Sequence, residues 1–138
     1  MSYSEVKVDT RDIQLKDPLN PQLFSDVAEH AANACTRRRS EVNKSSQLRR
    51  FYDELVYLNN KVQRSENKSE EYKRVAPYVQ MLRAKAAYAK GRKLIDVEFY
   101  ERFNVLIQQV DSEKTLERAK LFFEAFLGFK KAIEDIEK

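Results

Sequence analysis

Apolar residues recur every three or four positions through most of this 138-residue chain, which is the spacing of one face of an α-helix. The clearest example runs from residue 48 to residue 62, where one face carries Leu48, Phe51, Tyr52, Leu55, Leu58 and Val62. The opposite face carries Arg49, Arg50, Asp53, Tyr57, Lys61 and Arg64. The pattern predicts an amphipathic helix that begins near Asn43 or Ser45, either of which can act as its N-cap.

One further helix is predicted on each side of this one. Asn20 followed by Pro21 is a typical helix start, and the apolar spacing after it predicts a helix over residues 21–36. A polar loop at 65–69 precedes a third helix, which ends around Gly91. The apolar stripe of this third helix consists of Val75, Tyr78, Val79, Leu82, Ala86 and Ala89. Pro77 either kinks it or marks its first turn.

The last two helices are expected over residues 97–110 and from the Asp111-Ser112 cap nearly to residue 138. Apolar residues cover about half the circumference of the final helix, which is wider than the stripe of about 100° that a surface helix needs. Phe122, Phe129 and Ile136 lie seven residues apart along one border of that face. They indicate either a deeply buried central helix or a contact with a second subunit.

The composition favours an all-α fold, because two glycines, three prolines and abundant Lys, Glu, Leu and Ala are typical of helices. The length of the chain fits one domain. We therefore expect a compact bundle of about five helices over residues 20–138, with residues 1–19 as an extended or mobile N-terminal arm.

Charge is distributed unevenly along the chain. Residues 36–93 contain 16 basic and 6 acidic side chains, a net charge of +10, while the other 10 basic and 16 acidic side chains give −6. A local excess of cations attracts a polyanion, and nucleic acid is the leading candidate. The charge alone fits an ordinary solvated surface equally well. The basic triplet at 37–39 follows the C-terminal end of the first predicted helix, where cations complement the helix dipole, so part of the triplet could cap this helix instead of binding a partner.

Catalysis is the function class that the sequence supports least. His30 is the only histidine and Cys35 the only cysteine, so a Cys-His nucleophile or a thiolate metal site cannot be assembled with confidence. Carboxylate pairs such as Asp53 and Glu54 are consecutive and point about 100° apart on a helix. Two glycines leave no Gly-rich phosphate loop. We expect no enzymatic activity, no metal and no cofactor.

Several features indicate a cytoplasmic protein without a membrane partner. No apolar run approaches the roughly 20 residues that cross a bilayer, and the first residues lack the pattern of a secretory signal. A single cysteine is typical of a reducing compartment.

The third helix has a strip of small side chains opposite its core stripe. The strip consists of Ala76, Ala84 and Ala87, with Arg83 and Lys90 on one side and Arg74 and Lys85 on the other. A phosphate backbone or a partner helix could lie there, although exposed alanines also simply favour helix. Tyr57 and Tyr88 project from charged faces, and they are the tyrosines that we expect to contact nucleic acid.

Three segments in this order resemble the small helical subunit of type III-A CRISPR effector complexes, the Csm complexes. They are residues 45–54 (SSQLRRFYDE), residues 82–92 (LRAKAAYAKGR) and the Phe-rich final helix that ends Phe129-Lys130-Lys131. The resemblance covers residues 43–132. It implies a helical bundle without catalytic activity, present in several copies as an inner filament of a ribonucleoprotein. The partners that it implies are guide and target RNA, the backbone and large subunits, and further copies of the chain itself.

By position in these motifs, the resemblance implies RNA contacts for six cations, namely Arg49, Arg50, Arg83, Lys85, Lys90 and Arg92, and next to them for Lys44 and Lys61. Because they come without a base-reading device, we expect them to hold phosphates and sugars independently of base sequence. Two alternatives stay open, a helical adaptor that binds an acidic protein and a small subunit of another CRISPR effector subtype.

Overall fold

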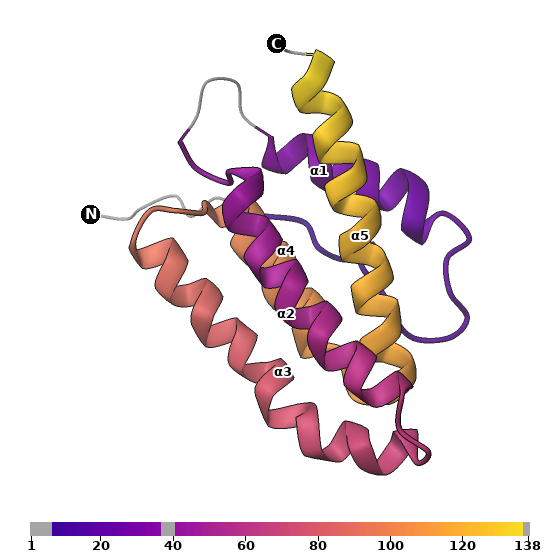
Figure 1. Ribbon diagram of the computed structural model, residues 1–138. Helices are drawn as coiled ribbons and strands as arrows, with labels where there is room; N and C mark the ends of the chain where they lie inside the picture. The colour runs from indigo at the N-terminus through magenta and orange to yellow at the C-terminus, as the bar shows by residue number, and fades with distance from the viewer. Residues whose placement is uncertain (1–6, 37–40, 137–138) are drawn as a thin grey trace.

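The computed structural model describes residues 7–36 and 41–136, and within these ranges the fold is helical without strands (Figure 1). In chain order the elements are a π-helical turn η1 (Leu23–Val27), α1 (Ala28–Cys35), α2 (Ser45–Gln63), α3 (Lys68–Gly91), α4 (Val97–Gln108) and α5 (Glu113–Ile136). The prediction of an all-α bundle with about five helices is confirmed. The first helix, predicted over residues 21–36, is observed over residues 23–35, and it begins as η1 before it continues as α1.

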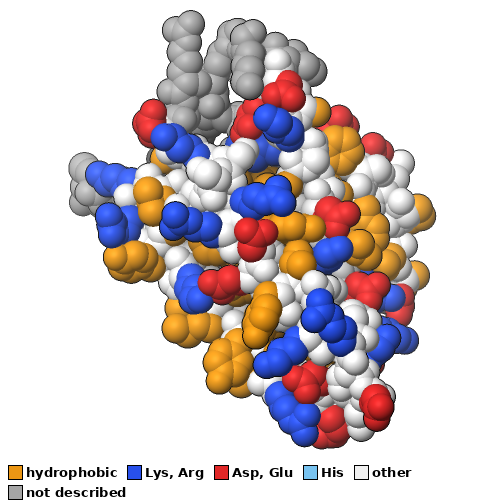
Figure 2. Space-filling view, viewed as in Figure 1, with side chains coloured by type: hydrophobic (Ala, Val, Ile, Leu, Met, Phe, Trp, Pro, Cys, Tyr) orange, Lys and Arg blue, Asp and Glu red, His pale blue; other side chains and the backbone are white. Residues whose placement is uncertain are grey.

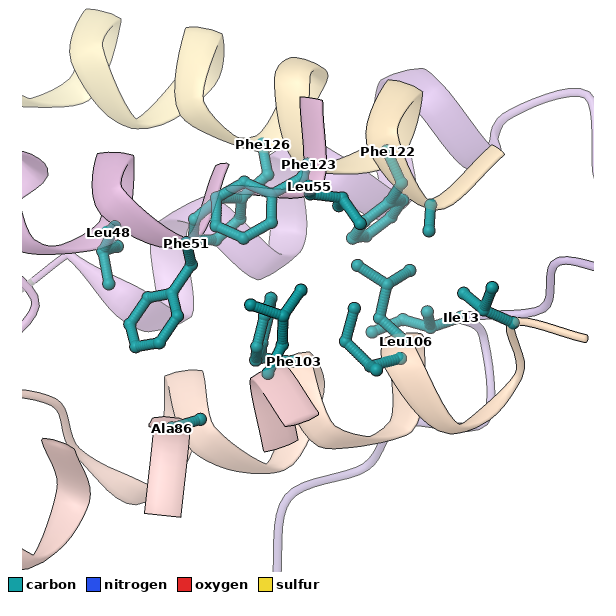
Figure 3. Close-up of a cluster of buried hydrophobic side chains, with 14 of the residues drawn as sticks. Ile13, Leu48, Phe51, Leu55, Ala86, Phe103, Leu106, Phe122, Phe123 and Phe126 are labelled. Carbon is teal, nitrogen blue, oxygen red and sulfur yellow. The ribbon is translucent and has the colours of Figure 1, made fainter. Parts of the chain in front are cut away.

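The long helix α5 packs against α1 and α2, while α3 packs against α4 and α2 at the edge of the bundle. Phenylalanine rings fill the space between α2, α4 and α5 (Figure 3). The rings of Phe51, Phe99, Phe103, Phe123 and Phe126 have neighbouring centroids 5.1 to 6.0 Å apart. Tilted and edge-to-face pairs at these separations add to the free energy gained by burying the rings.

The wide apolar face of α5 is explained by its neighbours on several sides. Phe122 is only 3 % exposed and faces the core of its own subunit, so it offers no surface to a second subunit. Phe129 is partly buried against the same core, and the side chain of Ile136 lies outside the described part of the structure. A subunit contact therefore stays a prediction for Phe129 and Ile136 alone.

From residue 7 to the start of η1 the N-terminal segment forms neither helix nor strand, and turns at 11–12 and 21–22 and a bend at 16–18 interrupt it; residues 1–6 lie outside the described range. Ile13 and Leu15 are buried in the same core as the helices. The side chain of Gln109, just after α4, donates to the Ile13 carbonyl at 2.6 Å and accepts from the Leu15 amide at 2.8 Å. Arg118 of α5 donates to the Leu15 carbonyl at 2.9 Å. This segment is thus fastened by side chains of the bundle.

Helix α2 begins at Ser45 as predicted, but the prediction that Asn43 or Ser45 caps it is wrong. Its N-cap position is Lys44, which makes no side-chain capping bond. Asn43 is buried at a φ of 58° and bonds to residues far along the chain, and Ser45 Oγ donates to the Glu134 carboxylate at 2.9 Å. Both side chains connect distant segments instead of ending a helix. The basic triplet at 37–39 lies outside the described residues.

Helix α3 begins at Lys68, nine residues before Pro77, so Pro77 does not mark its first turn. The helix changes direction in its N-terminal half, the half that contains Pro77 (Figure 1). A proline in a helix interior removes one backbone hydrogen bond and kinks the helix. The first alternative, a kink, is the one that the structure supports.

Candidate nucleic-acid interface

A groove lies on the surface between α2 and α3, and we call it the α2–α3 groove. It consists of two hollows of about 560 and 390 Å³ that share Glu54 and Lys85 in their walls. The larger hollow is lined by Glu54, Tyr57, Leu58, Lys61, Glu71, Arg74, Val75, Tyr78, Met81 and Lys85. The smaller one is lined by Gln47, Arg50, Phe51, Glu54, Lys85, Tyr88, Ala89, Arg92 and Leu94. Figure 2 shows Lys and Arg side chains interspersed with exposed hydrophobic side chains on the face that carries α2 and α3.

Four of the eight predicted RNA-binding cations line this groove, namely Arg50 and Lys61 from α2, Lys85 from α3 and Arg92 directly after it. Two others face α4 instead. The guanidinium of Arg83 donates to the Asn104 side chain at 2.8 Å, and Lys90 Nζ lies 4.9 Å from the centroid of the Tyr100 ring. The structure therefore divides the cations of α3 between two sides of that helix.

The last two predicted cations lie outside both groups. Lys44 Nζ is 2.7 Å from the Glu41 carboxylate in the segment before α2. Arg49 Nε is 3.8 Å from the Asp53 carboxylate on the exposed side of α2. RNA contact by these two residues stays a prediction, as it does for the other six.

The groove is electropositive although several of its charges are paired. Its lining has five cations, the fifth being Arg74, and two carboxylates, which gives a net charge of +3. Lys85 Nζ lies 2.8 Å from Glu54 and joins α3 to α2, and Arg74 lies 2.9 Å from Glu71 within α3. Exposed ion pairs of this kind contribute only about 0–1 kcal/mol, so a phosphate can replace the carboxylate at little cost.

The chain matches the Csm2 Type III-A family over residues 19–135. It belongs to that family. It is therefore a small subunit of the type III-A Csm complex, a structural and generally non-catalytic class of subunit. The match begins at residue 19 and so also includes α1, which precedes the segments that carried the resemblance. Comparison with curated proteins and with solved structures gives no match.

The single cysteine and the single histidine of this Csm2 family member, Cys35 and His30, are absent from the groove lining. Cys35 is fully buried, and burial raises the pKa of its thiol to about 12, so it packs as a small apolar residue. His30 is exposed on α1. Over residues 7–36 and 41–136, no group of three or more His, Cys, Asp or Glu residues could hold a metal ion. The expectation that the chain lacks enzymatic activity stays a prediction.

No described helix of this family member is both long and apolar enough to cross a membrane.

The prediction that Tyr78 belongs to the core stripe of α3 is wrong, because its side chain is 66 % exposed and lines the groove. Tyr78 lies on the border of the stripe, where a ring can turn toward either side. Arg74 lies four residues before Tyr78 and Lys85 lies seven after it, so all three share one face of the helix. Both cations line the groove, and this spacing is the sequence signal that could have placed Tyr78 on the groove side of α3. The prediction that Tyr57 and Tyr88 project from charged faces is confirmed, since both are well exposed.

Proposed function

We propose that this chain is a non-catalytic RNA-binding subunit of a type III-A CRISPR ribonucleoprotein. It lines the duplex of guide RNA and target RNA through the basic face of α2 and α3. In this role it supports guide-directed recognition of target RNA in antiviral defence in the cytoplasm. Backbone subunits, the large subunit and further copies of the chain are its partners, and the catalytic steps belong to other subunits.

The observation that carries this proposal is the gathering of Arg50, Lys61, Lys85 and Arg92 around one groove in a chain of the Csm2 family. Long basic side chains without a fixed base-edge reader suit phosphate oxygens, which repeat along any sequence. Base pairing between guide and target then supplies the choice of sequence. Membership of the Csm2 family supports a place in the type III-A complex, and the basic groove supports binding of RNA.

The test is a double charge reversal on α2. In the reconstituted complex, Arg49→Glu with Arg50→Glu is expected to weaken retention of RNA by about tenfold or more, because favourable phosphate interactions become repulsive. Both side chains are exposed, so the fold is expected to stay intact. Retention is measured by filter binding of labelled target RNA to the assembled complex.

The matched control is Lys16→Glu with Lys114→Glu, which changes the net charge by the same amount at exposed positions outside the groove lining. A smaller loss in the control supports a local interface. Unchanged RNA retention in a folded and fully assembled Arg49 and Arg50 variant would contradict the proposal. Loss of subunit assembly with normal RNA binding would favour the adaptor alternative.

A further inference from the structure

We infer that the α2–α3 groove binds unpaired nucleotides of an RNA strand, with the phosphates on its cations and the bases stacked on its tyrosines. The inference rests on the proposed RNA-binding function and goes further, because it states which form of RNA this groove takes. Duplex contacts are then left to the other basic residues of α2 and α3.

The first support is the order of side chains along the groove side of α3. The stripe reads Arg74, Tyr78, Met81, Lys85, Tyr88 and Arg92, at spacings that alternate between four and three. Such spacing keeps one face of a helix, and a rise of about 1.5 Å per residue makes this face about 27 Å long. Arg74 and Arg92 therefore lie at the two ends of the stripe and Lys85 lies between them, with Tyr78 before Lys85 and Tyr88 after it. A single strand offers the same alternation of phosphate and base.

The second support is the exposure of the rings. Tyr57, Tyr78 and Tyr88 are 63 %, 66 % and 65 % exposed, so the fold does not need their faces for its own core. Tyr57 on α2 and Tyr78 on α3 line the same hollow from its two walls. Tyr88 lies in the neighbouring hollow, where Arg92 donates to its hydroxyl at 3.1 Å. Each hollow thus combines an accessible ring with cations.

The form of the RNA follows from what these rings can contact. In a duplex each base face is covered by the next base pair, so a protein ring reaches only phosphates and groove edges. An unpaired nucleotide presents a phosphate and a free base face together, and aromatic rings stack on that face whatever the base. The two hollows, of about 560 and 390 Å³, have room for a nucleotide each, since small-ligand sites span about 300–1,000 Å³.

A protein segment suits the groove less well. Apolar partner sites are contiguous patches of a few hundred Å², whereas the larger hollow here is lined by three cations, Lys61, Arg74 and Lys85, as well as by its tyrosine rings. The net charge of +3 around the groove also favours a polyanion.

The experiment is a binding titration of the full chain with two fluorescent RNAs of equal length, an unstructured single strand and a duplex, at several salt concentrations. The test variant is Tyr57→Leu with Tyr78→Leu, and the matched control is Tyr57→Phe with Tyr78→Phe. We expect the Leu variant to bind the single strand at least about tenfold more weakly and the Phe variant to bind it nearly as well as the unchanged chain. Affinity for the duplex and the salt dependence are expected to stay the same in both, because no phosphate contact is removed.

The outcomes separate this inference from the proposed function. If the unchanged chain binds neither RNA, the proposed function fails and the inference fails with it. If RNA is bound but the folded Leu variant keeps its affinity for the single strand, only the inference is overturned. The same holds if the Leu variant binds both RNAs normally yet no longer enters the complex, since the groove then holds a protein. Thermal unfolding followed by circular dichroism checks that both variants are folded.

Discussion

At the scale of single residues, Asn43 decides how three segments of the chain meet. Its side chain donates to the Cys35 carbonyl at the end of α1 at 3.1 Å and to the Asp96 carboxylate before α4 at 2.8 Å. Its side-chain oxygen accepts from the Asp96 amide at 3.1 Å. A φ of 58° is a left-handed conformation, which asparagine tolerates better than most residues. Asparagine therefore suits this position for two reasons: it tolerates the left-handed backbone, and its side-chain amide makes these three hydrogen bonds.

We expect Asn43→Ala to lower the free energy of unfolding by about 3 kcal/mol, because it strains the backbone and removes three hydrogen bonds, one to the Cys35 carbonyl and two with Asp96. Asn43→Gly removes the strain but not the lost bonds, so it is expected to cost about 2 kcal/mol. The comparison variant is Asn67→Ala, which removes an exposed N-cap bond to Glu70 at 3.1 Å and is expected to cost about 1 kcal/mol. Urea unfolding measures all three. Equal losses at residues 43 and 67 would contradict the junction role.

At the scale of helices, α5 is joined to the start of α2 by one carboxylate. Glu134 accepts from Ser45 at 2.9 Å and pairs at 2.5 Å with Lys130, which is only 3 % exposed. The N-terminus of α2 lacks a side-chain cap, and a negative charge close to a helix N-terminus is stabilising. Burial alone raises the pKa of Glu134, but the hydrogen bonds from Lys130 and Ser45 outweigh it and bring the pKa below its ordinary value of 4.5.

This lowered pKa predicts a stability contribution that depends on pH. Because the pKa is lower in the folded chain than in the unfolded chain, the contribution is complete above about pH 4.5 and is lost as pH falls through the folded value. We expect Glu134→Gln to cost about 2 kcal/mol or more at pH 7, since it leaves Lys130 buried without its ion-pair partner. The difference from the unchanged chain is expected to shrink below pH 4.5.

Urea unfolding at a series of pH values measures this difference. Glu117→Gln is the control, because it removes the same charge from an exposed position of α5. A Glu134 effect that is the same at pH 3 as at pH 7 would show that the carboxylate charge is not its cause.

At the scale of the whole molecule, local pairing reduces the charge that a partner meets. The net charge of +10 over residues 36–93 suggests a uniformly basic region, but acidic side chains are mixed with the basic ones on the face of α2 and α3 (Figure 2). Arg49, Lys85 and Arg74 all have carboxylate partners. Asp53 and Glu54, the consecutive carboxylates that point too far apart to act as a catalytic pair, are two of these partners. After these ion pairs are counted, the α2–α3 groove still has a net charge of +3, which is the positive charge that attracts a polyanion.

Removing a carboxylate from the groove is therefore expected to strengthen RNA binding. Glu54→Gln raises the net charge of the groove to +4 and releases Lys85 from its ion pair. We expect an affinity gain of several-fold and a salt dependence of log affinity that is steeper by up to about one unit, as for one added phosphate contact. Titration of the full chain with RNA at several salt concentrations measures both. Glu117→Gln, which makes the same charge change outside the groove, is expected to have a smaller effect on affinity and no effect on the slope.

The sequence by itself determined the number and type of helices, because a period of 3.6 residues follows directly from helix geometry. It also determined that Arg49, Arg50, Tyr57 and Lys61 point away from the core, since each lies opposite an apolar stripe. The family resemblance from residues 43–132 is confirmed by the match to the Csm2 Type III-A family.

Only the tertiary structure decided which helix each exposed face meets. Periodicity places Arg83 and Lys85 on opposite sides of the alanine strip of α3, but only the positions of α4 and α2 make the first a partner of Asn104 and the second a groove cation. The same reason explains why Tyr78 is exposed, why Phe122 is buried and why Asn43 joins loops instead of capping α2. Contacts between residues far apart in the chain depend on how the helices pack. The apolar pattern of the sequence shows which face of each helix is buried, but it does not show which other helix packs against that face.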